Sequence, residues 1–120
     1  YLTIYGTLKN MNSKSQKDIL EKLFLVLKDR KINPSENSYV ASLYRDGNNK
    51  INEKIIEEAQ EYIEAIKTNK KSSIIHEAAD LWFHTFVSLA LNDLTASDIL
   101  EELDRRFGQS GIEEKESREK

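Results

Sequence analysis

Chain breakers are scarce in this sequence, which contains four glycines and one proline in 120 residues. Glycine and proline interrupt helices and form most tight turns, so their scarcity favours few turns and long regular elements. Surface scaling indicates that a chain of this length buries about two-thirds of the surface that its unfolded form exposes. We therefore expect one domain with one hydrophobic core, built from helices.

Apolar residues recur at helical spacing in four segments, each bounded by capping or turn residues. The spacing predicts helices over residues 15–30, 49–68 and 74–91 and from a Thr95 cap to Gly108, with a short helical turn over residues 38–43. Ser15 with Asp18, and Thr95 with Asp98, form the capping pairs. In the last helix we expect Ile99, Leu100 and Leu103 to face inward. The predicted fold class is all-α.

The two ends of the chain lack this periodicity. Residues 1–13 are predicted to be a linker or the end of a preceding domain, residues 14–108 the helical domain, and residues 109–120 a charged tail. The chain begins at Tyr1 rather than Met, so we expect it to be a fragment or one half of a longer polypeptide.

Composition excludes several classes of function. The chain has no cysteine, so disulfides, thiol nucleophiles and thiolate metal sites are absent, and we expect a cytoplasmic setting. Its net charge is −3 and no block of like charge stands out, which disfavours nucleic acid as a partner. The most apolar segment, residues 81–91, is interrupted by His84, Thr85 and Ser88, so we expect no membrane span.

The segment over residues 74–91 is apolar on nearly every side, which is typical of a central, buried helix. One thin polar stripe interrupts it, formed by Glu77, Asp80, His84 and Ser88. Two carboxylates on a buried helix need compensation, because an unpaired buried charge is very costly. Either a cationic side chain or a metal ion must face Glu77 and Asp80.

The segment over residues 49–68 offers the complementary half of such a site. It contains the pair Glu58-x-x-Glu61, and the later segment contains Glu77-x-x-Asp80. Each pair places two carboxylates one turn apart on one helix face, and antiparallel helices would bring all four together. Such oxygen ligands suit Mg²⁺, or Mn²⁺ as an alternative. A di-iron centre is disfavoured because neither pair supplies a Glu-x-x-His.

Simpler interpretations stand beside these. A glutamate-rich face is usually solvated, and a Lys or Arg could pair with the acids of the buried stripe. Lys54 is as compatible with an ion pair to Glu58 as with a phosphate contact. His84 is interpreted as a hydrogen-bonded structural residue. Three aromatic residues at helical spacing are predicted to be core: Trp82, Phe83 and Phe86.

Two linked motifs resemble a known family. They are Lys50-Ile51-x-x-Lys54-x-x-Glu57-Glu58-Ala59-x-Glu61 and His76-Glu77-Ala78-Ala79-Asp80-Leu81-x-x-His84. Together they are similar to phosphoribosyl-ATP pyrophosphohydrolase, within the all-α, MazG-like NTP pyrophosphatase superfamily. Three further stretches favour the histidine-pathway branch: Leu27-x-Asp29-Arg30-Lys31-x-Asn33-Pro34, Ser38-Tyr39-Val40-Ala41-x-Leu43 and Ser110-Gly111-Ile112-Glu113-Glu114-Lys115.

The resemblance implies a four-helix, MazG-like bundle completed by dimerisation, and hence a homodimer. It also implies hydrolysis of phosphoribosyl-ATP to phosphoribosyl-AMP and pyrophosphate, the second step of histidine biosynthesis. The last of the three stretches resembles the ending of enzymes in which this domain follows a phosphoribosyl-AMP cyclohydrolase domain. Residues 1–13 would then be the junction with that fused domain.

The resemblance also assigns roles to individual residues. Mg²⁺ would be held by Glu58, Glu61, Glu77 and Asp80, so that the negative substrate can enter an acidic site. Glu57 is the candidate for activating water or supporting the ligands, beside Glu58. Lys54, with Lys50 or an Arg106 supplied by a neighbouring subunit, would neutralise phosphate oxygens.

Two other functions remain open at this level. A MazG-like housecleaning enzyme acting on ordinary or non-standard nucleoside triphosphates would use the same metal ligands. A non-catalytic helical interaction domain would leave the acidic faces merely solvated. Only the flanking stretches separate the first alternative from the histidine pathway.

Overall fold

The computed structural model describes residues 19–107, which form five helices and no strand. The helices are α2 (Ile19–Ile32), α3 (Tyr39–Asp46), α4 (Asn48–Thr68), α5 (Lys71–Leu91) and α6 (Ala96–Arg106). The all-α prediction is therefore confirmed. The predicted linker and tail, the Ser15 and Asp18 cap, Gly108 and the stretch over residues 110–115 lie outside the described residues.

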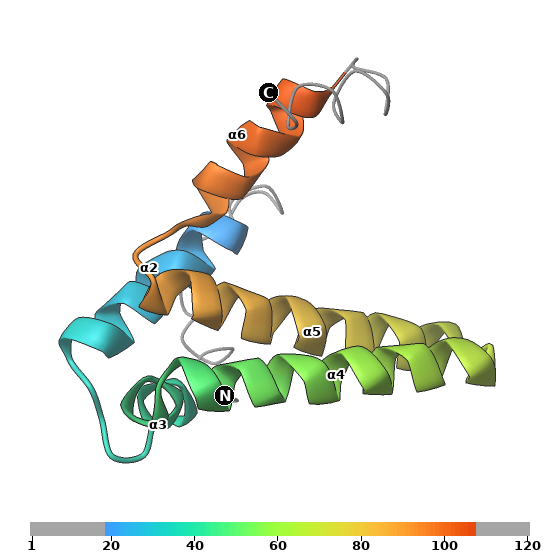
Figure 1. The fold of residues 1–120 in the computed structure, drawn as a ribbon, viewed down its shortest axis with the longest axis horizontal. Coiled ribbons are helices and arrows are strands. Elements are labelled where there is room, and N and C mark those ends of the chain that lie inside the picture. Colours follow the sequence, from blue (N-terminus) through green and yellow to red (C-terminus); the bar gives the residue numbers. More distant parts are fainter. Residues whose placement is uncertain (1–18, 108–120) are drawn as a thin grey trace.

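An antiparallel hairpin of α4 and α5 is the longest part of the structure. The two helices have 21 residues each and lie side by side along their length (Figure 1). Asn69 ends α4 in the left-handed conformation, with φ 61°. This geometry reverses the chain within two residues, so α5 begins at Lys71 and not at Ile74 as predicted.

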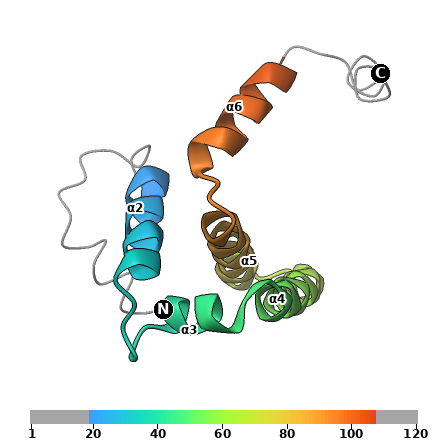
Figure 2. The same ribbon diagram turned by 60° about the vertical axis from the view of Figure 1, so that its left-hand side comes forward.

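At the end of the hairpin away from the Asn69 turn, α2 packs against α5 and α3 packs against α4 (Figure 2). Ser38 begins α3, because its Oγ accepts a hydrogen bond from the Ala41 amide at 3.2 Å. Thr95 begins α6 with the predicted capping box to Asp98. From there α6 projects away from the hairpin (Figure 1).

One core joins α2, α3, α4 and α5. Leu27, Val40, Ile51 and Val87 are fully buried in it. Each comes from a different helix, and burying each of them contributes about 1.5–3 kcal/mol relative to an exposed position. The core therefore fixes α3 against the hairpin.

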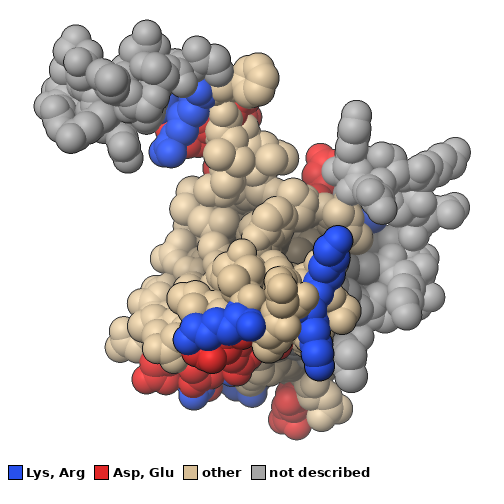
Figure 3. All heavy atoms as spheres, turned by 90° about the vertical axis from the view of Figure 1, so that its right-hand side faces the viewer, with Lys and Arg blue, Asp and Glu red and all other residues tan. Residues whose placement is uncertain are grey.

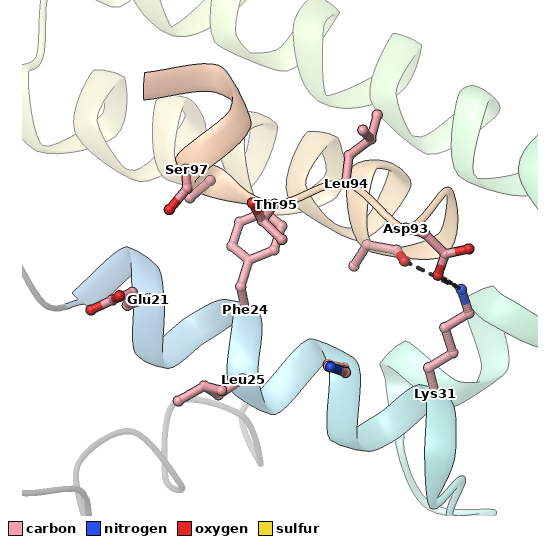
Figure 4. A pocket seen from close by; sticks show the side chains of 11 residues that line it. Glu21, Phe24, Leu25, Lys31, Asp93, Leu94, Thr95 and Ser97 are labelled. Atoms are coloured by element: carbon pink, nitrogen blue, oxygen red, sulfur yellow. Dashed lines mark hydrogen bonds and ion pairs between the residues drawn. The ribbon is translucent and has the colours of Figure 1, made fainter. Parts of the chain in front are cut away.

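Lys31 ties α2 to the end of α5. Its ammonium donates to the Leu91 carbonyl at 2.9 Å and to Asp93 Oδ1 at 2.7 Å, a favourable position for a cation at a helix C-terminus. A cavity of about 590 Å³ opens beside this contact, between α2 and the start of α6. Phe24 projects from α2 toward Thr95 across it (Figure 4).

Two burial predictions were wrong for the isolated chain. In α5, Phe83 is buried as expected, but Trp82 is 60% exposed. Ile99, Leu100 and Leu103 of α6 are 40–56% exposed. The five helices over residues 19–107 do not cover these faces, and their apolar surface faces outward.

A carboxylate cluster between α4 and α5

Carboxylates from both arms of the hairpin converge at one place. Glu58, Glu61 and Glu77 each present an oxygen such that the three atoms lie within 4.8 Å of one another. Because the helices are antiparallel and each acid pair spans one turn, the Glu58-x-x-Glu61 and Glu77-x-x-Asp80 pairs meet across the interface as the spacing predicts.

Asp80 belongs to a second group that shares Glu77. Its carboxylate, a Glu77 oxygen and a His76 ring nitrogen also lie within 4.8 Å of one another. The His76 Nε2 lies 3.4 Å from Asp80 Oδ2. The four predicted ligands therefore form two linked groups, with Glu77 in both.

The cluster is partly buried, since Glu61 is exposed and Glu77 is half-buried while the other two carboxylates are buried. Glu58 is 7% exposed and Asp80 is 9% exposed. Burial, followed by the neighbouring Glu61 carboxylate, raises the pKa of Glu58, and burial raises the pKa of Asp80. Negative charge here is disfavoured unless a cation accompanies it.

Two carboxylate oxygens of the cluster lack a protein partner among the described residues. Glu58 Oε2 and Glu77 Oε2 are buried and accept no hydrogen bond. A buried acceptor without a partner costs about 1–3 kcal/mol. Their oxygens fit a hard divalent cation such as Mg²⁺ or Mn²⁺, which takes oxygen ligands.

Lys54 is the cation nearest to these acids. Its ammonium donates to Glu57 Oε2 at 2.9 Å and lies 3.8 Å from Glu58 Oε1. The hydrogen bond holds the pKa of Glu57 below its usual range and raises that of Lys54. One lysine shared by two carboxylates cannot neutralise the whole cluster.

Tyr39 of α3 and His84 of α5 form a hydrogen-bonded pair next to Asp80. His84 is 2% exposed, and its Nδ1 lies 2.8 Å from the Asp80 carbonyl. Burial lowers the pKa of His84, which favours the neutral ring. In the neutral ring, Nδ1–H donates to the Asp80 carbonyl. Nε2 then accepts a hydrogen bond from the Tyr39 hydroxyl at 2.8 Å. The structural interpretation of His84 agrees with this geometry.

An open groove of about 570 Å³ runs along the cluster. Glu57, Glu61 and Glu77 line it, together with Ser73 from the start of α5. At the hairpin end of the molecule, acidic and basic side chains lie next to one another on a largely uncharged surface (Figure 3). This face offers no extended basic region for nucleic acid.

Two predicted substrate residues are not among the clustered oxygen ligands. Lys50 lies 3.7 Å from Glu53, and its positive charge also helps to lower the pKa of Glu57, which lines the groove. Arg106 is on α6, where its Nε donates to Glu102 at 2.9 Å. Sequence reasoning had given Arg106 to a neighbouring subunit, and that assignment stays a prediction.

The sequence analysis gave no role to Tyr39 or His76. His76 could have been found, since it precedes Asp80 by four residues and so shares its helix face. Tyr39 lies 45 residues from His84 in sequence, and only the packing of α3 against the hairpin brings them together.

The fold and the site define a class of protein: an all-α protein with a partly buried carboxylate cluster suited to a divalent cation. None of the described helices is long and apolar enough to span a membrane. Comparison with known families then places the chain within that class. The profile of phosphoribosyl-ATP pyrophosphohydrolase matches residues 20–107, and the chain belongs to this family.

Individual relatives agree with this family. A phosphoribosyl-ATP pyrophosphatase of Geotalea daltonii is 50% identical over 86% of this chain and 97% of its own length. One of Methylococcus capsulatus is 48% identical over 84% of this chain and 96% of its own length. The histidine biosynthesis bifunctional protein HisIE of Helicobacter hepaticus is 49% identical over 83% of this chain and 43% of its own length.

Proposed function

We propose that this chain hydrolyses phosphoribosyl-ATP to phosphoribosyl-AMP and pyrophosphate, the second step of histidine biosynthesis. The observation that carries the proposal is the convergence of Glu58, Glu61 and Glu77 from two helices of a chain in this family. Two buried oxygens of the cluster have no hydrogen-bond partner among residues 19–107. The relatives named phosphoribosyl-ATP pyrophosphatase support the choice of substrate.

We infer that Glu58, Glu61, Glu77 and Asp80 hold a divalent cation, Mg²⁺ or Mn²⁺. When bound, the cation would screen the polyphosphate charge and stabilise the departing pyrophosphate. The carboxylates come from two helices of 21 residues that pack against each other, so the helix backbones place them together before substrate arrives. Such preorganisation lowers the cost of reaching the transition state.

Lys54 and Glu57 complete the proposed chemistry. Lys54 would neutralise a phosphate oxygen as substrate enters the groove, and its bond to Glu57 would loosen. Glu57 then has an ionised carboxylate that can accept a proton from the attacking water. Glu57 is exposed and lines the groove, which gives water access to it. Lys50 and Arg106 remain proposed phosphate contacts.

We also propose a homodimer in which two α4–α5 hairpins form one four-helix bundle. Apolar side chains of the hairpin support it, since Ile63, Ile66, Ile75 and Trp82 are each 47–69% exposed. Two antiparallel helices cannot cover both of their own faces, whereas a second hairpin related by a two-fold axis presents the same surface in return.

Fusion to a phosphoribosyl-AMP cyclohydrolase domain stays a prediction. The likeness to the bifunctional relative supports it. Sequencing the gene on both sides of this region decides it: an adjoining cyclohydrolase domain in the same reading frame is expected, and a stop or start codon at the boundary would contradict it.

Pyrophosphate release from phosphoribosyl-ATP with Mg²⁺ tests the proposed activity. The same assay should include ordinary and deoxy nucleoside triphosphates, with Glu77→Gln as the inactive variant and Glu101→Gln, an exposed α6 residue, as the matched control. Selective turnover that Glu77→Gln abolishes and Glu101→Gln retains is the expected result. Turnover of the ordinary nucleotides instead would indicate a housecleaning enzyme, and no turnover of any substrate would favour an interaction domain.

A further inference from the structure

His76 stands at the outer edge of the carboxylate cluster. Its imidazole, Glu77 and Asp80 each present one atom such that the three atoms lie within 4.8 Å of one another. The side chain of His76 is 71% exposed, whereas that of Asp80 is 13% exposed. The group therefore combines a solvent-accessible nitrogen with two less accessible carboxylates.

The distance between the ligand atoms of His76 and Asp80 is the distance expected between two ligands of one metal ion. His76 Nε2 and Asp80 Oδ2 are 3.4 Å apart. Two ligands of a tetrahedral cation, each about 2.1 Å from it, lie about 3.4 Å apart. His76 and Asp80 also share one helix face at i and i+4, so α5 itself holds the spacing.

Glu77 links this group to the rest of the cluster. Its Oε2 is buried and accepts no hydrogen bond from a described residue, and the residue also belongs to the group with Glu58 and Glu61. Glu58, itself more than nine-tenths buried, likewise has an oxygen without a described partner. The cluster thus has more carboxylate oxygens than the neighbouring Lys54 can satisfy, and a carboxylate has two oxygens with which to serve two cations.

We propose that His76, Glu77 and Asp80 form a second divalent-cation position, and that its imidazole makes it favour Zn²⁺ or Co²⁺ over Mg²⁺. Mg²⁺ prefers oxygen ligands, while imidazole suits Zn²⁺ and other first-row transition metals. The inference rests on the proposed function for the identity of Glu77 and Asp80 as metal ligands. It adds a ligand, a second position and a different metal preference.

Nitrogen NMR of the histidine side chains tests this position directly. The chain contains two histidines, so the spectrum of untagged protein labelled with ¹⁵N-histidine contains one reporter and one internal control. On titration with Zn²⁺, the Nε2 resonance of His76 should shift. That of His84, which is buried and bonded to Tyr39, should stay. Mg²⁺, which is proposed to bind Asp80 without contacting the imidazole, should move the His76 resonance less than Zn²⁺ does.

Two variants separate a formed site from loose binding to an exposed imidazole. Glu77→Gln should abolish the His76 shift at the same Zn²⁺ concentration. His76→Asn should weaken Zn²⁺ binding by about tenfold or more, measured by calorimetry, and leave Mg²⁺ binding nearly unchanged. A His76 resonance that does not move, or moves equally in Glu77→Gln, would overturn the proposal.

The test of the second cation position does not require enzyme activity. A Zn²⁺-dependent His76 shift without pyrophosphate release from phosphoribosyl-ATP would sink the proposed function and leave the second position standing. Mg²⁺-dependent turnover with a His76 resonance that Zn²⁺ does not move would support the proposed function and overturn the second position.

Discussion

Glu58 is a carboxylate in a position where burial raises its pKa and so disfavours its charged form. Such a residue destabilises the metal-free chain and stabilises the chain that holds a cation. If Glu58 is a metal ligand, as proposed, the same side chain has opposite effects on stability in chelator and in Mg²⁺. A substitution that removes only the charge can separate the two.

Glu58→Gln should unfold at the same temperature as wild type, or higher, in chelator. In Mg²⁺ at 100 times its dissociation constant, wild type should gain about 2.7 kcal/mol of stability and the variant almost none. Thermal unfolding with and without Mg²⁺ measures this. Glu53→Gln, at an exposed site on the same helix, should keep the full gain. An equal gain in Glu58→Gln would exclude Glu58 as a ligand.

The contact of Tyr39 with His84 leads to a second prediction at this scale. Tyr39→Phe removes the donor to a nitrogen in a nearly fully buried ring, so it should cost about 1–3 kcal/mol of unfolding free energy. Urea denaturation measures the cost. Tyr62→Phe is the control, since the Tyr62 hydroxyl has no hydrogen-bond partner among residues 19–107, and should cost much less. Equal costs would show that the bond contributes nothing measurable.

The candidate site could be predicted from sequence only as far as spacing along single helices allows. Glu58-x-x-Glu61 and Glu77-x-x-Asp80 each depend on one helix, and the structure brings them together. The division into two groups that share Glu77 depends on how the two helices are rotated against each other. Tyr39 enters through a third helix. The spacing of residues along a single helix predicts neither the grouping of the carboxylates nor the contact of Tyr39.

At the scale of the elements, Gly47 controls how α3 meets α4. Its φ of 84° and ψ of −173° lie in a region that is essentially restricted to glycine. An added Cβ would touch nothing within 4 Å. Any cost of a side chain here is therefore backbone strain and not a clash.

Gly47→Ala should destabilise the protein by about 1–3 kcal/mol through that strain. Chemical denaturation gives the value. Asn49→Ala, two residues later on the exposed side of α4, should have a small effect of either sign. A neutral Gly47→Ala would mean that the junction relaxes to another backbone conformation.

Helix bounds were predictable where a chemical signal marks them. Thr95 and Asp98 formed the capping box that their spacing predicts, and the predicted start of α4 differs from the observed one by a single residue. The start of α5 was missed by three residues. Asn69-Lys70-Lys71-Ser72-Ser73 looks like a polar linker, and nothing local shows that one left-handed asparagine replaces most of it.

At the scale of the whole molecule, the helices over residues 19–107 have apolar surface that they do not bury against one another. Periodicity located the helices α5 and α6, but Trp82 and Leu103, predicted to be core and inward-facing, are exposed in the isolated chain. Amphipathic spacing shows which side of a helix avoids water. It does not say whether the covering surface belongs to the same copy.

Ile75→Lys should convert the proposed homodimer into monomers. Ile75 is 69% exposed and lies seven residues before Trp82 on the same face of α5, so a lysine there would bury a charge against the second hairpin. Sedimentation velocity should show the wild type as a dimer and the variant as a monomer. Glu101→Lys on α6 adds positive charge outside the hairpin and should stay dimeric.

Trp82 provides an independent readout of the same interface, because it is the only tryptophan in the chain. If a second hairpin covers it, its emission in the wild type should move to longer wavelength on dilution below the dimer dissociation constant. Ile75→Lys should show the long-wavelength emission at every concentration. A dimer that survives Ile75→Lys, with Trp82 emission independent of dilution, would place the interface elsewhere than on α4 and α5.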